Sequence, residues 1–262
     1  MTPEAKVEPG YSADSIGKLE LIWGQGFMSP GGPAEVGRIL GVQDITGCRV
    51  LDIGSGSGGA GLALARNHGA GGVVGIDVEA RLVDLANERA GTLGLQGRVR
   101  YQPVTPGPLP FGSGSFDVVF SKDAIIHIRD KAGIYAEALR VLRPGGRLLV
   151  GDWLRGEGEK VGPRVRDFVD ASGHDFTMLT LREIGAIVET LGFVDIELVD
   201  RQAWYLGEAR GELAKLRGVW GPEFVARWGE KALADEIDFW EVLVAALEEG
   251  AMRPGHIRAR KP

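Results

Sequence analysis

A glycine-rich segment that follows an apolar run has the composition of a cofactor-binding loop. Residues 52–58 read Asp-Ile-Gly-Ser-Gly-Ser-Gly and precede a helical pattern. Glycines let the backbone approach a ligand closely, and the next helix offers free N–H groups at its start. A dinucleotide fingerprint has nearly the same glycines, so the loop alone does not select one cofactor. Asp52, two residues before the first glycine, can receive an ammonium group and therefore favours an amino-acid-like ligand.

A second acidic residue, Asp77, ends the next apolar run at residues 72–77, 21 positions after Gly56. A carboxylate at this distance from a glycine loop can accept hydrogen bonds from both hydroxyls of a ribose. The alternative is that Asp77 caps the helix that follows. We expect the ribose role, because the distance fits it.

Asp123 and His127 follow the apolar run at residues 116–121 and could act on a second ligand. A carboxylate can hold and orient an ammonium, and an imidazole titrates near neutral pH and can accept a proton. The two residues share a face if the turn between them is helical. Alternatively, Asp123 caps a helix and His127 bonds to backbone. Their place at the end of an expected strand favours chemistry, because ligands bind there in parallel sheets.

Apolar runs that alternate with helical patterns predict the framework that positions these residues. We expect strands at 48–53, 72–77, 99–104, 116–121 and 147–152, and helices at 60–67, 79–92 and 131–142. The runs are almost continuously apolar, which is typical of a parallel sheet covered on both faces. Such a sheet brings the ends of its strands, and with them the acidic residues, to one edge.

The flanking segments predict additions to this sheet. Residues 1–42 read as a polar arm (1–17), a helix, the turn 29–32 and a second helix, and residues 43–200 as the core. Within the core, 155–162 is charged and rich in glycine, which favours a mobile loop, whereas 180–191 is helical and 194–199 alternates like a strand. Residues 201–250 read as a helical cap, with one long helical stretch at 208–249, and 251–262 as a final strand centred on 256–260. The tryptophans of the cap, Trp220, Trp228 and Trp240, are interpreted as helix-packing residues.

Four segments together resemble the class I methyltransferases that depend on S-adenosylmethionine (SAM). They are the loop at 52–58, Asp77, the run at 116–121 and the segment 141–150, and the resemblance covers roughly residues 18–153. It implies an α/β fold with a Rossmann-like, seven-stranded, mostly parallel sheet and helices on both faces. Its last strand would run antiparallel, and 194–199 and 256–260 are the candidates for the final two strands.

The resemblance also implies the cofactor site, with S-adenosylhomocysteine as the product. The residues expected to line it are Asp52, Gly54, Ser55, Gly56, Asp77, Val78, Val104, Thr105, Ser121 and Ser29. In these enzymes, the loop after the third strand usually supplies an acid to the adenine amine. Here it reads Pro-Val-Thr at 103–105, so backbone groups or the Thr105 hydroxyl would have to substitute.

A narrower resemblance links three segments to the phosphoethanolamine and related small-amine N-methyltransferases. These are 23–32, 121–128 and 255–260. The resemblance implies that the N-terminal arm closes over SAM and that Asp123 and His127 face the acceptor amine. Methyl transfer from a sulfonium requires a neutral lone pair on the acceptor, so Asp123 would orient the ammonium and His127 would act as general base.

The residues with which those enzymes grip a phosphate are missing. The matching places hold Trp153, Phe168, Phe176 and Leu243, the segment 169–175 lacks the expected arginine, and Leu19 replaces the arm tyrosine, although Tyr11 stands elsewhere on the arm. A buried phosphate without partners would be very costly. The candidate substrate-binding residues are therefore Phe27, Trp153, Phe168 and Phe176. Their rings could cage an alkylated ammonium, pack against an apolar natural product, or simply belong to the core.

We therefore expect a SAM-dependent methyltransferase that acts on a small molecule, preferentially at an amine nitrogen. Methylation of carbon, oxygen or sulfur in a natural product is the alternative within enzymes. A SAM-binding protein without catalysis is the alternative of another class, and an NAD oxidoreductase is more distant.

Composition supports an ordinary globular enzyme. The 262 residues carry a net charge of −6, which argues against non-specific nucleic-acid binding. The single cysteine, Cys48, excludes an internal disulfide and is interpreted as a buried residue at the start of a strand. No run of about 18 apolar residues predicts a membrane span, and residues 1–10 lack a signal core, so we expect a cytoplasmic monomer or homodimer. The histidines do not form a metal-ligand pattern, so no metal is expected.

Overall fold

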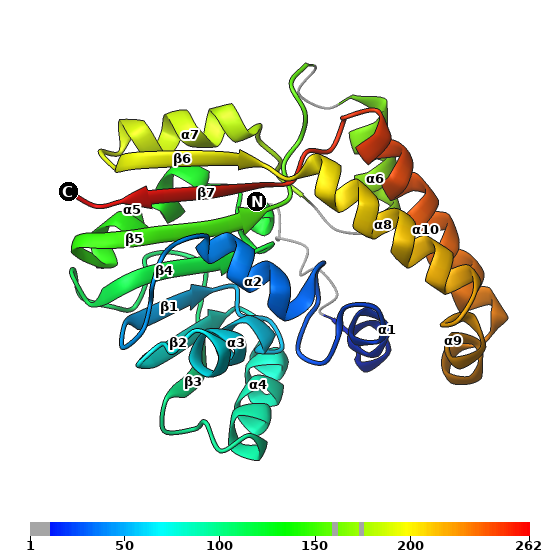
Figure 1. Cartoon of the computed structure of the whole chain (residues 1–262), viewed down its shortest axis with the longest axis horizontal. Coiled ribbons are helices and arrows are strands. Elements are labelled where there is room, and N and C mark those ends of the chain that lie inside the picture. Colours follow the sequence, from blue (N-terminus) through cyan, green and yellow to red (C-terminus); the bar gives the residue numbers. More distant parts are fainter. Residues whose placement is uncertain (1–10, 159–161, 173–175) are drawn as a thin grey trace, which may run out of the picture.

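A seven-stranded sheet forms the centre of the molecule (Figure 1). In the computed structural model, residues 11–158, 162–172 and 176–262 are described. The strand order is β3-β2-β1-β4-β5-β7-β6, and β7 runs antiparallel to both of its neighbours while the other pairs are parallel. The strands are β1 (Arg49–Ile53), β2 (Gly72–Asp77), β3 (Val99–Pro103), β4 (Phe116–Lys122), β5 (Leu142–Asp152), β6 (Val194–Asp200) and β7 (Gly255–Arg260). The predicted fold class is confirmed.

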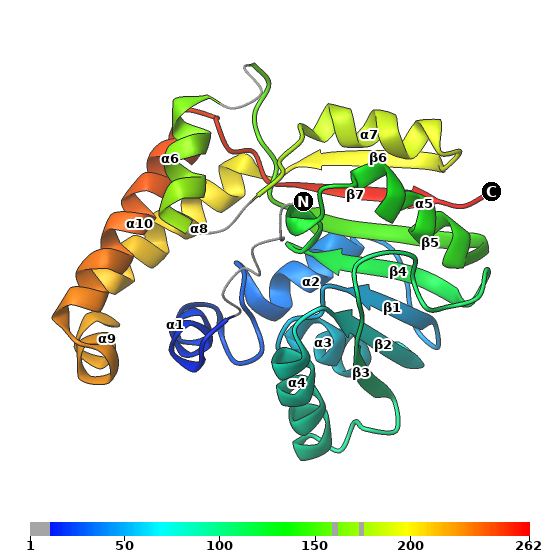
Figure 2. The ribbon, with the colours of Figure 1, turned by 180° about the vertical axis from the view of Figure 1, so that it is seen from behind.

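Helices cover both faces of the sheet. Those beside it are α2 (Gly32–Leu40), α3 (Gly59–Asn67), α4 (Ala80–Thr92), α5 (Lys131–Val141) and α7 (Leu181–Thr190). Alternate strand residues face opposite sides: Val50 packs with α2, α3 and α4, whereas Leu51 packs with α5 and α7. Figure 1 shows α2 and α3 in front of the strands, and Figure 2 shows α5 on the other side. Burial on both faces explains why the strands read as continuous apolar runs.

The helical cap forms a lobe beside the sheet (Figure 1). It consists of α6 (Pro163–Ser172), α8 (Gln202–Arg217), α9 (Gly221–Trp228) and α10 (Glu230–Glu248). The expected long helical stretch is thus broken twice, near Gly218 and at Gly229, whose φ of 89° ends α9. Trp240 is fully buried and Trp220 and Trp228 are partly buried in the cap, in agreement with their interpretation as packing residues.

The N-terminal helix α1 (Ala13–Trp23) joins the cap to the core. Glu212 of α8 accepts hydrogen bonds from the indole nitrogens of Trp23, at 2.8 Å, and of Trp240, at 3.1 Å. Burial raises the pKa of Glu212 to about 7, which these two bonds offset only in part. Helix α1 therefore packs against the cap. Residues 1–10 of the predicted polar arm lie outside the described residues.

Two sequence expectations about loops were wrong. β5 begins at Leu142 rather than Arg147, because Leu142 pairs with Phe116 and because the backbones of Gly145 and Gly146 bond to Lys261. Arg155, expected in a mobile loop, is buried and donates to both carboxylate oxygens of Glu183. Residues 159–161 of that loop are not among the described ones.

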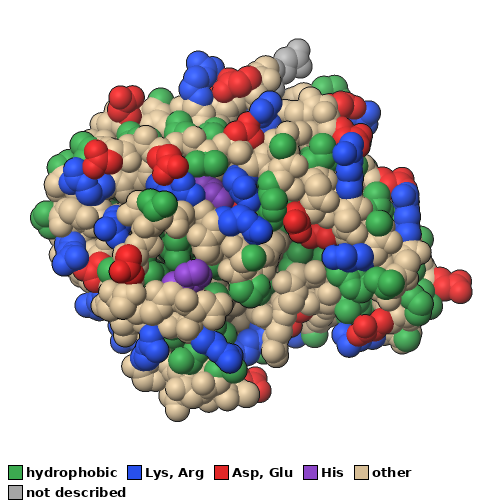
Figure 3. All heavy atoms as spheres, in the orientation of Figure 1, with side chains coloured by type: hydrophobic (Ala, Val, Ile, Leu, Met, Phe, Trp, Pro, Cys, Tyr) green, Lys and Arg blue, Asp and Glu red, His purple; other side chains and the backbone are tan. Residues whose placement is uncertain are grey.

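The surface carries no single dominant charge on the face shown in Figure 3, where basic and acidic side chains are interspersed over both sheet and cap. Within the described ranges, no helix has an apolar stretch long enough to cross a bilayer. The same residues contain no cluster of three or more His, Cys, Asp or Glu side chains suited to a metal ion, and His174 lies outside them. Cys48 is half-buried just before β1.

Candidate active site

The glycine loop turns sharply between β1 and α3. Gly54, Gly56 and Gly58 have positive φ angles of 72°, 49° and 97°, which residues with a Cβ rarely adopt. The N–H groups of Gly54 and Ser55 donate to the carbonyl of Ile76, at 2.9 and 3.0 Å, which fixes the loop against β2. A Cβ atom on Gly54 would overlap the side chain of Ala124. The glycine thus allows the loop after β4 to approach the cofactor loop directly.

Asp52 supports the expected ammonium site. Its side chain is only 1% exposed, and neither carboxylate oxygen has a hydrogen-bond partner in the described part of the chain. Burial, with a smaller contribution from the charge of Asp77, raises the pKa of Asp52 to about 7. The hydroxyl of Ser55 is likewise buried without a partner among these residues. Unpaired acceptors at a strand end fit the amino-acid part of SAM, because an ammonium would satisfy them.

Asp77 holds the loop and the start of α4 together. One carboxylate oxygen accepts the N–H of Gly56 at 2.8 Å, and the other accepts the N–H of Glu79 at 3.0 Å. Burial raises the pKa of Asp77, and these backbone bonds offset the rise. Asp77 is not the N-cap of α4, because Glu79 occupies that position and α4 has no side-chain cap bond. The remaining acceptor capacity of the Asp77 carboxylate fits ribose hydroxyls.

The other expected cofactor residues gather at the ends of β2 and β3. Val78 is 59% exposed although it is apolar. Val104 is half-buried, and its N–H donates to the carbonyl of Asp77 at 2.9 Å, while Thr105 is exposed. Together, these residues form an open edge beside Asp77 that fits an adenine ring. Ser121 differs from them, because its buried hydroxyl donates to the Ile53 carbonyl at 2.9 Å and joins β4 to β1.

Lys122, which the sequence analysis missed, connects the expected cofactor and acceptor residues. Its ammonium lies 2.6 Å from the Ser29 hydroxyl and 2.6 Å from Oδ2 of Asp123. Lys122 is almost completely buried, so this pair is shielded from solvent. The only signal in the sequence was a lysine at the end of an otherwise apolar strand.

Asp123 and His127 lie on the same loop but not on the same helical face. Asp123 adopts a positive φ of 52° and donates its N–H to Gly151 at 2.8 Å. Only Ile125–His127 form a helical turn, η1, so Asp123 precedes it. His127 is exposed, and its ring meets Phe176 edge-on with centroids 5.0 Å apart.

A second missed lysine fixes the turn that carries His127. The buried ammonium of Lys131 donates to the carbonyls of Ile125 at 2.6 Å, Ile126 at 3.2 Å and Ile128 at 2.6 Å. Burial lowers the pKa of Lys131, and the nearby Asp152 partly offsets this. Burial, followed by the charge of Asp123, raises the pKa of Asp152 to about 8. No sequence pattern indicates this role, because Lys131 stands where a solvated lysine would start a helix.

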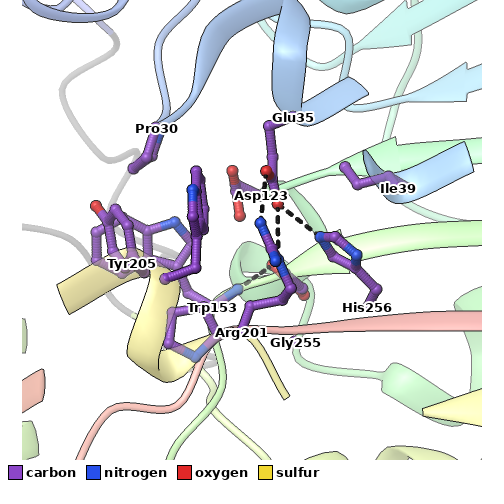
Figure 4. A pocket seen from close by; sticks show the side chains of 13 residues that line it. Pro30, Glu35, Ile39, Asp123, Trp153, Arg201, Tyr205, Gly255 and His256 are labelled. Carbon is purple, nitrogen blue, oxygen red and sulfur yellow. Dashed lines mark hydrogen bonds and ion pairs between the residues drawn. The ribbon is translucent and has the colours of Figure 1, made fainter. Parts of the chain in front are cut away.

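A small cavity of about 20 Å³ opens beside Asp123 (Figure 4). It is lined by Pro30, Glu35, Ile39, Asp123, Gly151, Asp152, Trp153, Arg201, Trp204, Tyr205, Pro254, Gly255 and His256. Figure 4 shows Arg201 and His256 converging on Glu35, with 2.6 Å between His256 Nε2 and Glu35 Oε1. Elements from the arm, the sheet and the cap thus meet here, and His127 does not line this cavity.

Three of the four aromatic residues predicted to bind substrate come together. Trp153 stacks on Phe168 at 5.2 Å and Phe168 on Phe176 at 5.9 Å, and Trp153 alone of these lines the cavity. Phe168 is fully buried in the cap, as is Leu243. Phe27, the fourth, packs in the core against the start of α3, so the structure places it away from the cavity.

The arm is fastened to the cofactor loop by Glu20. Its carboxylate accepts the N–H of Gly26 at 3.0 Å and the hydroxyl of Ser57 at 3.2 Å, and it pairs with Arg89 at 2.6 Å. The carbonyl of Gly26 also accepts the N–H of Gly59, at 2.9 Å. The arm therefore contacts the cofactor loop directly.

Comparisons with known proteins agree with the fold and with a SAM-dependent methyltransferase. A family model described as a methyltransferase domain matches residues 45–167. A phosphoethanolamine N-methyltransferase of Triticum aestivum is 29% identical over 246 residues, which are 94% of this chain and 47% of that protein. The 27-O-demethylrifamycin SV methyltransferase of Amycolatopsis mediterranei (strain S699) is 30% identical over 222 residues, 80% of each chain.

Among solved structures, phosphoethanolamine N-methyltransferase 2 of Haemonchus contortus, in complex with phosphomonomethylethanolamine and S-adenosylhomocysteine, superposes with a TM-score of 0.88. It is 28% identical and covers 97% of this chain, which covers 59% of that one. The chain therefore belongs to the class I SAM-dependent methyltransferases, and SAM is its cofactor. It spans about half the length of the Triticum relative.

Proposed function

We propose that the protein transfers the methyl group of SAM to an amine nitrogen of a small molecule. The observation that carries this proposal is the position of Asp123, which lines an aromatic-walled cavity. Its neighbour Ala124 lies against Gly54 of the cofactor loop. A carboxylate at this junction can hold an ammonium close to the methyl donor. The names of the Triticum and Haemonchus relatives support the choice of an amine.

Four side chains act on the two ligands in the proposed reaction. Asp52 receives the ammonium of SAM and Asp77 its ribose, while bound SAM supplies an electrophilic methyl group on a sulfonium. Asp123 orients the acceptor nitrogen. His127, which does not line the cavity, accepts through water the proton that the nitrogen must lose before it attacks. Most of the rate acceleration then comes from positioning, because the leaving group is part of the cofactor.

Lys122 determines which carboxylate oxygen of Asp123 is available to the acceptor. It occupies Oδ2 of Asp123, which leaves Oδ1 for an acceptor N–H. The lysine weakens the attraction of the carboxylate for a free cation, but it fixes the direction in which the remaining oxygen points. An acceptor that offers both an N–H group and a complementary surface for the aromatic walls therefore fits better than a simple inorganic cation.

A second candidate function is O-methylation of a natural product. The name of the Amycolatopsis relative favours it, since that protein covers 80% of this chain. The apolar stack of Trp153, Phe168 and Phe176 suits an aromatic acceptor, and His127 would deprotonate a phenol.

A screen with methyl-labelled SAM against amines, phenols and amino acids tests both functions. We expect amines to be methylated and the His127→Ala variant to lose most of this activity near neutral pH while it retains SAM binding. The matched control is His68→Ala, which removes a half-buried histidine at the end of α3, remote from Asp123 in the fold. Unchanged turnover of His127→Ala between pH 6 and 9 would show that His127 is not the base. Methylation of phenols alone would favour the second function.

A further inference from the structure

Tyr205 of α8 places a buried hydroxyl beside the proposed acceptor site. The residue is 1% exposed and lines the cavity that contains Asp123. Its oxygen has no hydrogen-bond partner within the described ranges. Burial raises the pKa of Tyr205 well above its usual range, so the hydroxyl keeps its proton. An unsatisfied buried hydroxyl is unfavourable, and a hydrogen bond to a ligand oxygen or nitrogen in the cavity would satisfy it.

Neighbouring rings hold Tyr205 in place. Trp153 meets it edge-on at 5.2 Å and Trp204 stacks on it at 5.9 Å. Trp204 is itself flanked by the guanidinium groups of Arg201, at 4.3 Å, and Arg38, at 5.2 Å. The phenol therefore cannot swing away to find another partner without disturbing the whole stack.

The basic side chains that line the cavity are already engaged. Among the described lining residues, these are Arg201 and His256, and both bind Glu35. Burial alone would raise the pKa of Glu35, but the bonds from His256 and Arg201 outweigh it and keep the pKa low. Glu35 is therefore charged, and its carboxylate already pairs with the guanidinium of Arg201.

The remaining charges near the cavity also disfavour an anion. Lys122 is bonded to Ser29 and Asp123, and the lining includes the carboxylates of Glu35 and Asp123. A dianionic phosphate would meet carboxylates and no uncommitted cation among the described lining residues, which is very unfavourable in a buried site. A neutral oxygen avoids this repulsion and can form a hydrogen bond with the unpaired hydroxyl of Tyr205.

We propose that Tyr205 is a substrate-binding residue that selects a phosphate-free amine with a neutral hydrogen-bonding oxygen, such as a short amino alcohol. This inference rests on the proposed amine methylation. The ammonium of the acceptor faces Asp123, its oxygen bonds to the Tyr205 hydroxyl, and its carbon atoms lie against the indole rings.

Three amines that differ at one end test the inference. Ethanolamine, propylamine, which replaces the hydroxyl by a methyl group, and phosphoethanolamine are each offered with labelled SAM. We expect kcat/KM for ethanolamine to exceed that for both others by about tenfold or more, because one hydrogen bond to a buried partner is lost in propylamine. Tyr205→Phe should remove the preference over propylamine and leave SAM affinity unchanged.

Tyr135→Phe is the matched control. Tyr135 is also fully buried with an unpaired hydroxyl in the described structure, but it packs under the sheet with α5 and does not line the cavity. Both variants should keep or raise the melting temperature, because each removes an unsatisfied hydroxyl. Only Tyr205→Phe should change the acceptor preference.

Two results would overturn the inference while amine methylation stands. One is a higher kcat/KM for phosphoethanolamine than for ethanolamine, and the other is an unchanged preference in Tyr205→Phe. If SAM binds but none of the three amines is methylated, the proposed amine reaction fails, and the inference fails with it.

Discussion

The substitution Asp52→Asn should stabilise the cofactor-free protein and weaken its affinity for SAM. Burial raises the pKa of Asp52 from an ordinary value of 3.8 to about 7. This rise corresponds to about 4 kcal/mol of unfavourable free energy for the charged carboxylate above pH ~7. The folded state binds the proton more tightly than the unfolded state, so the penalty is absent below pH ~4 and grows as the pH rises to ~7. Asn carries no charge and avoids the penalty.

The same carboxylate should make SAM binding depend on pH. The ammonium of SAM favours the charged form of Asp52, so the bound protein holds this proton less tightly than the free protein. Below pH ~7, SAM must displace the proton, and the affinity of the wild type should fall by up to about tenfold per pH unit. Asp52→Asn should lose this dependence. At pH 8 it should bind SAM about 10- to 100-fold more weakly, because a charge-assisted hydrogen bond is lost.

Urea unfolding of the cofactor-free protein and calorimetric titration with SAM, both between pH 5.5 and 8.5, measure these effects. Asp84→Asn on α4 is the matched control, because it makes the same chemical change at an exposed position. We expect the control to change neither the free energy of unfolding nor SAM affinity by much. A cofactor-free Asp52→Asn protein that is less stable than the wild type at pH 8, or SAM affinity equal to that of the wild type, would refute the reasoning.

Three further substitutions test how the site is held. Gly54→Ala should abolish SAM binding in calorimetry, because φ is 72° and the new methyl group would overlap the loop after β4, whereas Gly91→Ala, with open space around it, should be harmless. Lys131→Met should lower the free energy of unfolding by about 3 kcal/mol or more, because three carbonyls lose their donor, and should reduce kcat more than SAM affinity. Equal losses in both would contradict a role in positioning the η1 turn. Arg89→Met should release the arm from the cofactor loop by breaking the pair with Glu20, and stopped-flow measurements should show SAM dissociating about tenfold faster. An unchanged dissociation rate would mean that the arm does not retain the cofactor.

The local pattern of the sequence was sufficient for the sheet and the cofactor loop. Apolar runs such as residues 50–53 and Gly72–Asp77 are strands with both faces buried. Burial on both faces requires apolar residues at nearly every position, so the residue types alone indicate these strands. The positions of Asp52 and Asp77 follow from the same pattern, since each ends or nearly ends a strand. Parallel strands bring such ends to one edge, whatever the rest of the chain does.

The acceptor side depended on contacts between distant parts of the chain. The cavity joins Glu35 of α2, Tyr205 of α8 and His256 of β7 to Asp123, and no local pattern links these four residues. Lys122 and Lys131 are lysines that local composition assigns to solvent, but the packing of neighbouring elements buries them against carbonyl, hydroxyl and carboxylate groups. The pattern of apolar residues in the sequence was thus sufficient to predict the fold and the edge of the sheet where Asp52 and Asp77 lie. Only the tertiary structure decided which side chains share the acceptor cavity, because their neighbourhood arises when arm, sheet and cap pack together.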